Sequence, residues 1–450
     1  MRLFDEALEV VPENPVVNYN RGLVQQQAGS IEAAIVAYRA ATEVQPQFPE
    51  AWINLSQALK LLGRFSQATE AAEKAVQLGP TEPSAWLAMG NALRGLHALG
   101  QAMDVFRRGV ELAPADGPLK VSLANTTREL GQVPEAIRLL REAVGAHPDF
   151  AEAHRDLAHA LLLNGDYREG WAENRWRWDT ESLHNAKRHQ AIPEWKGQPL
   201  TGKRILGWDE QGFGDAIQFV RFVPWLAEMG AEVVLETQPQ LVRLFETVDG
   251  VTEVIPRGGT LPPVDYQVSL LDLGGVFGSD PTSIPNATPY LYVGKESRFA
   301  AAERMRVGLC WAGNPDHDND RNRSMEFDLL KPLLELPRID FVSLQAGQGA
   351  GEAGLKEALG NPIDFLETAR LVATLDLVIT IDSSVAHLAG ALGQAVWVLL
   401  PYGPDWRWML GRDDSPWYPD ATLFRQANPG DWTAPIREMC RKIIDFSRHY

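Results

Sequence analysis

Cysteine is almost absent from this sequence, with Cys310 and Cys440 the two in 450 residues. They form no C-x-x-C pair, so we expect neither a disulfide scaffold nor a cysteine zinc site. No apolar run approaches the ~18 residues that a membrane helix needs, and no membrane span is expected. Asp5 and Glu6 stand where a signal peptide would be basic and then apolar. We therefore predict a cytoplasmic location.

Positive charge is also scarce, because 59 acidic residues outnumber 42 lysines and arginines and leave a formal net charge of −17. A general nucleic-acid binder needs a basic surface, so we expect no nucleic-acid partner. The acidic balance does not exclude one small anion in a local pocket. Low-complexity tracts are absent, and 45% hydrophobic with 22% charged residues is typical of a folded chain.

Proline recurs at a fixed interval in the first third of the chain. One evenly spaced series consists of Pro12, Pro46, Pro80, Pro114 and Pro148. Positions in phase with them are the large Trp52 and Trp86 and the small Ala34, Ala68, Ala102 and Ala136. Small residues let two helices approach closely, proline ends a helix, and a single hairpin must stack on neighbours to bury its apolar face. This pattern resembles the tetratricopeptide repeat of about 34 residues and predicts an α superhelix.

The repeat pattern assigns residues 1–178 to this superhelix and its capping helix. Phe4, Ala7 and Pro12 are in phase with the second helix of a repeat whose first helix is missing, so we expect a chain cut from a longer protein. The last hairpin departs from the pattern in Gly170–Trp178, as a cap or docking surface does. Since concave solenoid surfaces usually serve recognition, we predict a protein or peptide partner there. Packing of the repeats on the rest of the chain is the alternative.

Strand and helix patterns alternate after residue 203. The predicted strands are Arg204–Trp208, Glu232–Glu236, Val251–Ile255, Tyr266–Leu271, Arg306–Trp311, Phe341–Leu344, Leu377–Ile381 and Val396–Leu400. Predicted helices between them include 216–229, 368–375 and 385–392. This alternation predicts parallel sheets with covered faces. We expect two Rossmann-like α/β halves, 203–300 and 301–430, after a linker at 179–202 and before a closing helix at 431–450.

Three segments fall at predicted strand ends, where such sheets bind ligands. In Gln211–Ala216, Gly212 and Gly214 permit a sharp turn and close approach of a ligand to the backbone. Asp215 then begins a helix, either as a capping residue or as a functional carboxylate.

The second segment is Asp382–His387, which leads from a strand into a helix. Ser383 and Ser384 place hydroxyls and free backbone N–H groups at the helix start, which favours an anion. An ordinary serine cap followed by a buried, hydrogen-bonded histidine is the alternative. The third segment is the loop Trp311–Ser324, whose Arg321 and Arg323 suit a diphosphate.

Two of these motifs together resemble glycosyltransferase family 9. They are Gly214–Phe219 and Asp382–Gly393, which occur in this order and lie far apart in the sequence. The resemblance implies a bacterial, heptosyltransferase-like enzyme with two Rossmann-like halves, the GT-B fold. The repeats make the chain similar to bacterial repeat-fused members and, more distantly, to the O-GlcNAc transferases. Pro404–Trp408 and Ser415–Tyr418 are typical of the repeat-fused branch.

The resemblance also implies roles for single residues. Asp215 matches the general base, and Arg323 stands where the family has a basic residue for the diphosphate. Gln345 stands near the nucleoside. Asp382, Ser383 and His387 match the phosphate-binding turn, and the other predicted donor-site residues are Gly212, Gly214, Trp311, Asn314 and Ser384. Heptosyltransferases typically have glycine in place of Ser384, so a heptose donor is not implied.

The implied reaction is an inverting transfer of a sugar from a nucleotide-diphosphate sugar to an acceptor hydroxyl. We predict no cofactor and no metal ion, because the helix start and Arg323 would stabilise the departing diphosphate. Two other classes of function fit the same sequence. One is a repeat scaffold with an inactive nucleotide-binding part, and the other is a nucleotide-sugar epimerase.

Overall fold

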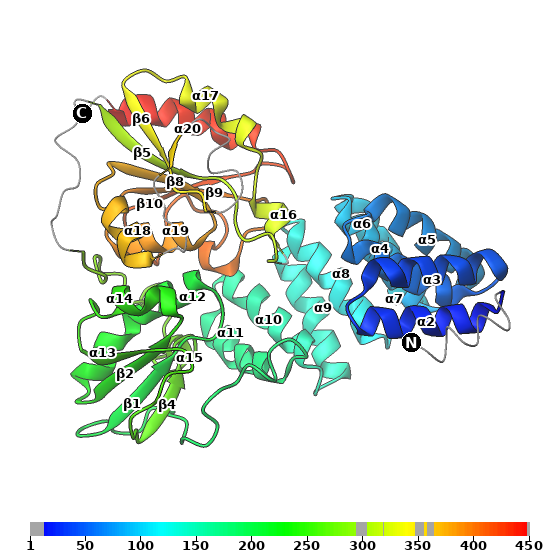
Figure 1. Ribbon diagram of the computed structural model, residues 1–450, viewed down its shortest axis with the longest axis horizontal. Coiled ribbons are helices and arrows are strands. Elements are labelled where there is room, and N and C mark those ends of the chain that lie inside the picture. Colours follow the sequence, from blue (N-terminus) through cyan, green and yellow to red (C-terminus); the bar gives the residue numbers. More distant parts are fainter. Residues whose placement is uncertain (1–12, 294–303, 318, 347–354, 358–363, 448–450) are drawn as a thin grey trace. The chain divides into compact units, whose positions relative to one another are not determined.

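The computed structural model describes residues 13–293, 304–317, 319–346, 355–357 and 364–447 (Figure 1). The chain divides into two compact units, Met1–Leu157 and Ala158–Tyr450. Two sequence predictions lie outside the described residues. They are the partial repeat at Phe4, Ala7 and Pro12 and the boundary between the α/β halves at residues 300 and 301.

Helices follow one another through the first unit and form hairpins that repeat along the chain (Figure 1). They are α2 (Pro15–Gln27), α3 (Ile31–Val44), α4 (Pro49–Leu61), α5 (Phe65–Leu78), α6 (Pro83–Gly95), α7 (Leu99–Leu112), α8 (Gly117–Glu129), α9 (Val133–Ala146) and α10 (Ala151–Asn164). The first helices of successive hairpins begin at equal intervals, at Pro15, Pro49, Pro83, Gly117 and Ala151. The predicted repeat of helical hairpins is therefore confirmed. Proline suits the first turn of a helix because its missing N–H has no partner there in any case.

Close packing inside the hairpins explains the small residues of the repeat. A Cβ atom added to Gly22 would lie 2.5 Å from Cε1 of Tyr38, and one added to Gly90 would lie 2.3 Å from Cε1 of Phe106. Tyr38 and Phe106 are fully buried. Each large ring on a second helix therefore packs against glycine on the first helix of the same hairpin.

The last hairpin is divided between the two units. The boundary between the units falls within α10, and the second helix, α11 (Tyr167–Asn174), and the turn η1 (Arg175–Asp179) belong to the second unit. The sequence assigned residues 158–178 to the repeat domain, and here they pack in the α/β unit. Trp171 lies 5.4 Å from Trp406 between ring centroids, and its Nε1 donates a hydrogen bond to the Ser279 carbonyl at 2.8 Å.

The first sheet of the second unit has four parallel strands in the order β3-β2-β1-β4. They are β1 (Arg204–Trp208), β2 (Glu232–Thr237), β3 (Val251–Pro256) and β4 (Tyr266–Ser269). Around them lie α12 (Phe213–Phe219), η2 (Val220–Phe222), α13 (Val223–Glu228), η3 (Pro239–Leu241), α14 (Val242–Phe245) and α15 (Asp272–Val276). The single helix predicted over 216–229 is wrong, because it breaks at η2. Pro224 explains the break, since it lacks an N–H and its ring clashes with the carbonyl four residues earlier.

The segment 179–202, which we expected to be a linker, packs on this sheet. The Trp195 side chain is buried, and the backbone N–H of Trp195 donates to the Gln267 carbonyl at 2.8 Å. Arg188 donates to Glu236 at 2.8 Å, and its guanidinium carbon lies 4.8 Å from the ring centroid of Trp208. These contacts bring the segment beside β4 and over the ends of β1 and β2.

The second sheet has six parallel strands in the order β10-β9-β8-β5-β6-β7. They are β5 (Met305–Cys310), β6 (Ile339–Ser343), β7 (Lys356–Glu357), β8 (Leu377–Ile381), β9 (Val396–Leu400) and β10 (Ala421–Arg425). The helices and turns of this half are α16 (Asp320–Arg323), η4 (Phe327–Leu330), α17 (Lys331–Leu334), α18 (Phe365–Val372), α19 (Ser384–Ala391), η5 (Trp406–Trp408) and α20 (Thr433–Phe446). The predicted parallel sheets are confirmed, and α20 lies within the segment where we expected a closing helix.

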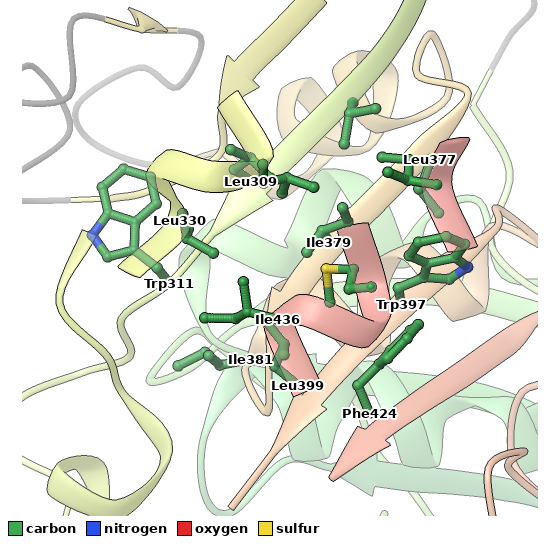
Figure 2. Close-up of a cluster of buried hydrophobic side chains, with 14 of the residues drawn as sticks. Leu309, Trp311, Leu330, Leu377, Ile379, Ile381, Trp397, Leu399, Phe424 and Ile436 are labelled. Atoms are coloured by element: carbon green, nitrogen blue, oxygen red, sulfur yellow. The ribbon is translucent and has the colours of Figure 1, made fainter. Parts of the chain in front are cut away.

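A buried cluster joins α20 to this sheet (Figure 2). Ile436 from α20 packs with Ile379 and Leu399 from the central strands β8 and β9. The opposite side of the sheet carries α18 and α19, which face the first half (Figure 1). There α19 packs against α12, and α18 packs against α14. The two halves therefore meet along two pairs of helices.

Candidate functional site

The order in which the chain adds strands to the second sheet reverses between β5 and β8, although all six strands are parallel. Starting from β5, the chain adds β6 and β7 on one side and then β8, β9 and β10 on the other. The loops that leave β5 and β8 therefore diverge at the carboxyl end of the sheet. Doubly wound sheets bind ligands in that crevice. It holds the start of the Trp311–Ser324 loop and the turn Asp382–Ser384.

The turn after β8 begins α19 with a serine cap. Ser383 Oγ accepts a hydrogen bond from the N–H of Val385 at 3.3 Å and lies 3.0 Å from Thr380 Oγ1. Ser384 is the first residue of the helix. The N–H of Ala386 donates to the Ser383 carbonyl at 3.0 Å, so the serine holds the first turn of the helix. The start of a helix favours an anion because of its dipole.

Asp382 precedes this cap and lies in a charged environment. Burial, followed by the nearby Asp405 carboxylate, raises the pKa of Asp382 to about 6. The Arg323 guanidinium donates to the Asp382 carbonyl at 3.2 Å and to Asp320 Oδ1 at 3.1 Å. Arg323 therefore lies beside the turn, as the sequence predicted, and is held there by its neighbour on α16.

His387 lies one turn into α19 and is buried between aromatic rings. Its Nδ1 is 2.8 Å from the Tyr418 hydroxyl, and its ring stacks on Trp408 with centroids 5.5 Å apart. Burial, with Arg407 nearby, lowers the pKa of His387 to about 3. The imidazole is therefore neutral at pH 7. This matches the buried, hydrogen-bonded histidine that the sequence left as an alternative.

Asp215 is the N-terminal carboxylate of α12, and both of its oxygens have partners. Oδ2 accepts from the N–H of Gly212 at 3.0 Å, so Asp215 does cap its helix. Oδ1 accepts from Arg407 Nη2, although 192 residues separate them in sequence. The side chain is 22% exposed. The carboxylate is therefore oriented by two hydrogen bonds while it still reaches solvent.

Arg407 is the functional candidate that sequence reasoning missed. Its Nη1 donates to Asp405 Oδ1 at 2.9 Å, and its Nε donates to Gln218 Oε1 at 2.6 Å. Burial alone would lower the pKa of Arg407, but Asp405 and Asp215 hold it above the ordinary value. The segment Pro404–Trp408 stood out in the sequence, but nothing local showed that its arginine meets Asp215.

Three predicted donor-site residues have their side chains engaged elsewhere. The Trp311 ring lies in the core of the second sheet, with its centroid 4.7 Å from that of Phe327 (Figure 2). Gln345 Oε1 accepts from the N–H groups of Trp311 and Ala312, and its Nε2 donates to the Ala312 carbonyl at 3.0 Å. Asn314 Oδ1 accepts from the N–H of Asp316 at 3.1 Å. These side chains shape the loop after β5.

The corresponding crevice of the first sheet is filled by the chain itself. It lies between β1 and β4, whose ends lead to Glu210 and Asp272. Arg177 from η1 is 1% exposed and donates to Glu210 at 2.8 Å and to Asp272 at 2.9 Å. A buried guanidinium thus occupies the place where a doubly wound sheet binds its ligand. The crevice of the second sheet is the candidate site.

Two features are missing from the residues that the structure describes. No group of three or more histidine, cysteine, aspartate or glutamate side chains is arranged to hold a metal ion within them. No helix in the described part of the chain is long and apolar enough to cross a membrane.

Comparisons with known proteins identify the repeats. The tetratricopeptide repeat profile matches residues 19–83, 62–117 and 121–170, so the chain carries tetratricopeptide repeats as predicted. The thermophilic tetratricopeptide repeat protein TTC0263 of Thermus thermophilus is 22% identical, with a TM-score of 0.34 over 38% of this chain and 92% of that protein. YrrB, described as a tetratricopeptide repeat protein with an unusual peptide-binding site, is 18% identical, with a TM-score of 0.31 over 40% and 94%.

A curated relative extends beyond the repeats. Protein FlbA of Caulobacter vibrioides (strain ATCC 19089 / CIP 103742 / CB 15) is 28% identical over an alignment of 341 positions. The match covers 67% of this chain and 56% of FlbA. The chain thus spans little more than half the length of this relative. The matched part, 67% of 450 residues, is longer than the first unit, which ends at Leu157. The similarity to FlbA therefore reaches into the α/β unit.

Proposed function

We propose that the second unit is a glycosyltransferase of the GT-B type that uses a nucleotide-diphosphate sugar. The observation that carries the proposal is the meeting of α12 and α19. Their motifs are far apart in sequence, yet Asp215 binds Arg407, and His387 at α19 stacks on the adjacent Trp408. A carboxylate from one half thus lies beside an anion-favouring turn from the other, which is the arrangement that group transfer requires.

The diphosphate of the donor would bind at the carboxyl ends of β5 and β8. The first N–H groups of α19 and the Arg323 guanidinium supply positive charge there. These groups stabilise the negative charge that develops on the departing nucleoside diphosphate. The neutral His387 adds no charge to this site.

In the proposed reaction the acceptor oxygen attacks the anomeric carbon of the sugar. The new bond joins that carbon to the acceptor, and the bond from the carbon to the β-phosphate oxygen breaks. Its electron pair leaves with the diphosphate, and the acceptor proton passes to Asp215. Each carboxylate oxygen has two acceptor positions. Because each oxygen of Asp215 carries one hydrogen bond within the protein, each has a position for the acceptor hydroxyl.

The acceptor in this proposal is a protein or peptide held by the tetratricopeptide repeats. Stacked hairpins form an extended concave surface that commonly binds such partners. The repeats would raise the local concentration of the acceptor near the transferase site.

The first test measures nucleotide binding by thermal shift across a panel of nucleoside diphosphates. A bound nucleotide at 100 times its Kd stabilises the folded state by about 2.7 kcal/mol. With the donor known, Asp215→Asn should lower kcat at least about 100-fold, as loss of a general base does. Asp249→Asn, an exposed aspartate of the same unit, is the matched control. Full turnover by Asp215→Asn would show that Asp215 is not the base.

A scaffold function is the second candidate, and the engaged side chains favour it. The side-chain amide of Gln345 is hydrogen-bonded to the backbone of Ala312, and the Trp311 ring lies in the core of the second sheet. Neither side chain therefore presents a group to a nucleoside. Calorimetry that detects no nucleotide, with or without a repeat-bound partner, would support the scaffold. Conversion of a nucleotide sugar without any acceptor, followed by NMR, would instead support an epimerase.

A further inference from the structure

Arg407 orients Asp215 because its own guanidinium is fixed on three sides. Asp405 accepts from Nη1 at 2.9 Å, and Gln218 accepts from Nε at 2.6 Å. The face of the guanidinium lies over Trp406, with its central carbon 4.4 Å from the ring centroid. Arg407 is 11% exposed. Only Nη2 is left to contact Asp215, so the position of the guanidinium sets the position of the carboxylate.

Trp406, in turn, is placed by the second helix of the last repeat. Its ring meets Trp171 edge to face, with centroids 5.4 Å apart, and Tyr167 at 6.4 Å. Trp171 itself cannot shift, because its Nε1 donates to the Ser279 carbonyl and a Cβ on Gly274 would lie 2.8 Å from its Cζ2. An unbroken line of contacts therefore leads from α11 through Trp406 and Arg407 to Asp215.

The backbone after Arg407 also has an unusual conformation. Met409 has a φ of +51° and a ψ of −170°, a conformation that side-chain-bearing residues rarely adopt. Its N–H donates to the Trp406 carbonyl at 3.2 Å, and Arg425 donates to the Trp408 carbonyl at 2.6 Å. The turn that presents Arg407 is thus held by one hydrogen bond within it and by one from Arg425 outside it.

We propose that Arg407 is the positioning residue for Asp215, and that α11 controls it through Trp406. This inference rests on the proposed function, since it concerns the carboxylate assigned as the base. It makes α11, the second helix of the last repeat, a working part of the transferase site. A change in α11 would then alter turnover without touching donor or acceptor.

The test uses the full chain and two independent readouts. Arg407→Lys keeps the charge but places all its donors on one nitrogen, so it loses the planar fork that spans Gln218, Asp405 and Asp215. Trp171→Leu removes the ring that places Trp406. Both should lower kcat at least about tenfold with the donor KM nearly unchanged, because a small misplacement of a catalytic group is costly. Trp171→Phe keeps an aromatic edge and should restore most of the rate. Trp225→Leu is the control, since Trp225 packs on Phe222 and Phe277 and lies outside the line of contacts.

Hydrogen exchange of segment 209–219 is the readout that needs no activity. The Gly212 N–H donates to Asp215 Oδ2, so it should exchange faster in Arg407→Lys and in Trp171→Leu but not in Trp225→Leu. Unchanged exchange of this segment in the first two variants would overturn the inference, as would wild-type kcat. If the wild-type chain transfers no sugar, the proposed function fails, and the exchange result still decides whether Arg407 and Trp171 position Asp215.

Discussion

Gly214 and His387 approach so closely that no side chain fits between them. A Cβ added to Gly214 would lie 2.8 Å from Cδ2 of His387. The ring cannot retreat, because it stacks on Trp408 and is 5% exposed. The sequence pointed to glycine here for the approach of a ligand to the backbone. In the structure, glycine is needed for the two α/β halves to meet.

Gly214→Ala should therefore separate α12 from α19. We expect a loss of about 1–3 kcal/mol in the free energy of unfolding, as overpacking of a buried contact costs. Nucleoside diphosphate binding should weaken with it. Gly145→Ala in α9 is the matched control, because a Cβ there meets no atom within 4 Å. Urea denaturation should show Gly145→Ala at or slightly above wild-type stability, and equal losses in the two variants would contradict the contact.

Arg177 should be worth far more to stability than its neighbour Arg175. Removal of Arg177 takes away the ion-pair partner of two buried carboxylates, Glu210 and Asp272. We expect Arg177→Met to cost about 3–5 kcal/mol at pH 7 in urea denaturation. Arg175→Met removes a pair with Glu194 whose arginine is 48% exposed, and it should cost at most about 1 kcal/mol. Similar losses for both would mean that the crevice between β1 and β4 is open to water.

The same cluster fixes how acid should act on the fold. Burial raises the pKa of Asp272, but Arg177 more than offsets this and leaves it below the ordinary value. As the pH falls, Asp272 therefore binds its proton at a higher pH in the unfolded chain than in the folded chain. Its contribution to stability is present near neutral pH and is lost as the pH falls through the pKa of Asp272 in the folded chain. In Arg177→Met the acid-sensitive contribution should disappear, so its stability should change less than wild type between pH 5 and pH 3.

Local pattern was enough to predict most of the fold. The even spacing of the prolines predicted the hairpins, since one repeated set of contacts needs the same residue types at each turn. Leu377–Ile381 and Val396–Leu400 were predicted to the residue, because buried parallel strands are continuous apolar runs. The predictions that were wrong concern segments whose contacts are made with residues far away in the sequence. Residues 179–202 have no period, yet Arg188 and Trp195 are held by Glu236 and Gln267, which lie far along the chain.

The candidate site was only partly predictable for the same reason. Capping and turn chemistry are local, so Gly212, Asp215 and Ser383 were found from their spacing. Arg407 was missed because its partner lies 192 residues earlier. Gln345 and Trp311 follow strand ends, as ligand-binding residues do. The conformation of the loop after β5 decides whether each side chain faces the crevice or packs inside the protein. Sequence pattern does not encode that choice.

The raised pKa of Asp382 predicts how the free energy of unfolding should change with pH. Its pKa is about 6 in the folded chain, against an ordinary value of 3.8. The folded state therefore binds more protons than the unfolded state between these values, and this contribution to stability is lost as the pH rises through about 6. Asp382→Asn removes that dependence. The stability of the variant relative to wild type should rise by about 2 kcal/mol between pH 4 and pH 8.

His387 does not disturb this comparison, although it titrates in the opposite direction. Its pKa is lowered to about 3, so its contribution to stability is lost as the pH falls from about 6.5. Wild type and Asp382→Asn share that contribution, and it cancels in their difference. The same pair of proteins tests the anion site. Ionisation of Asp382 places a negative charge beside Arg323 and the start of α19, so inorganic pyrophosphate should bind wild type more weakly relative to Asp382→Asn at pH 8 than at pH 5. A constant ratio of the two affinities across this range would place the anion away from the turn after β8.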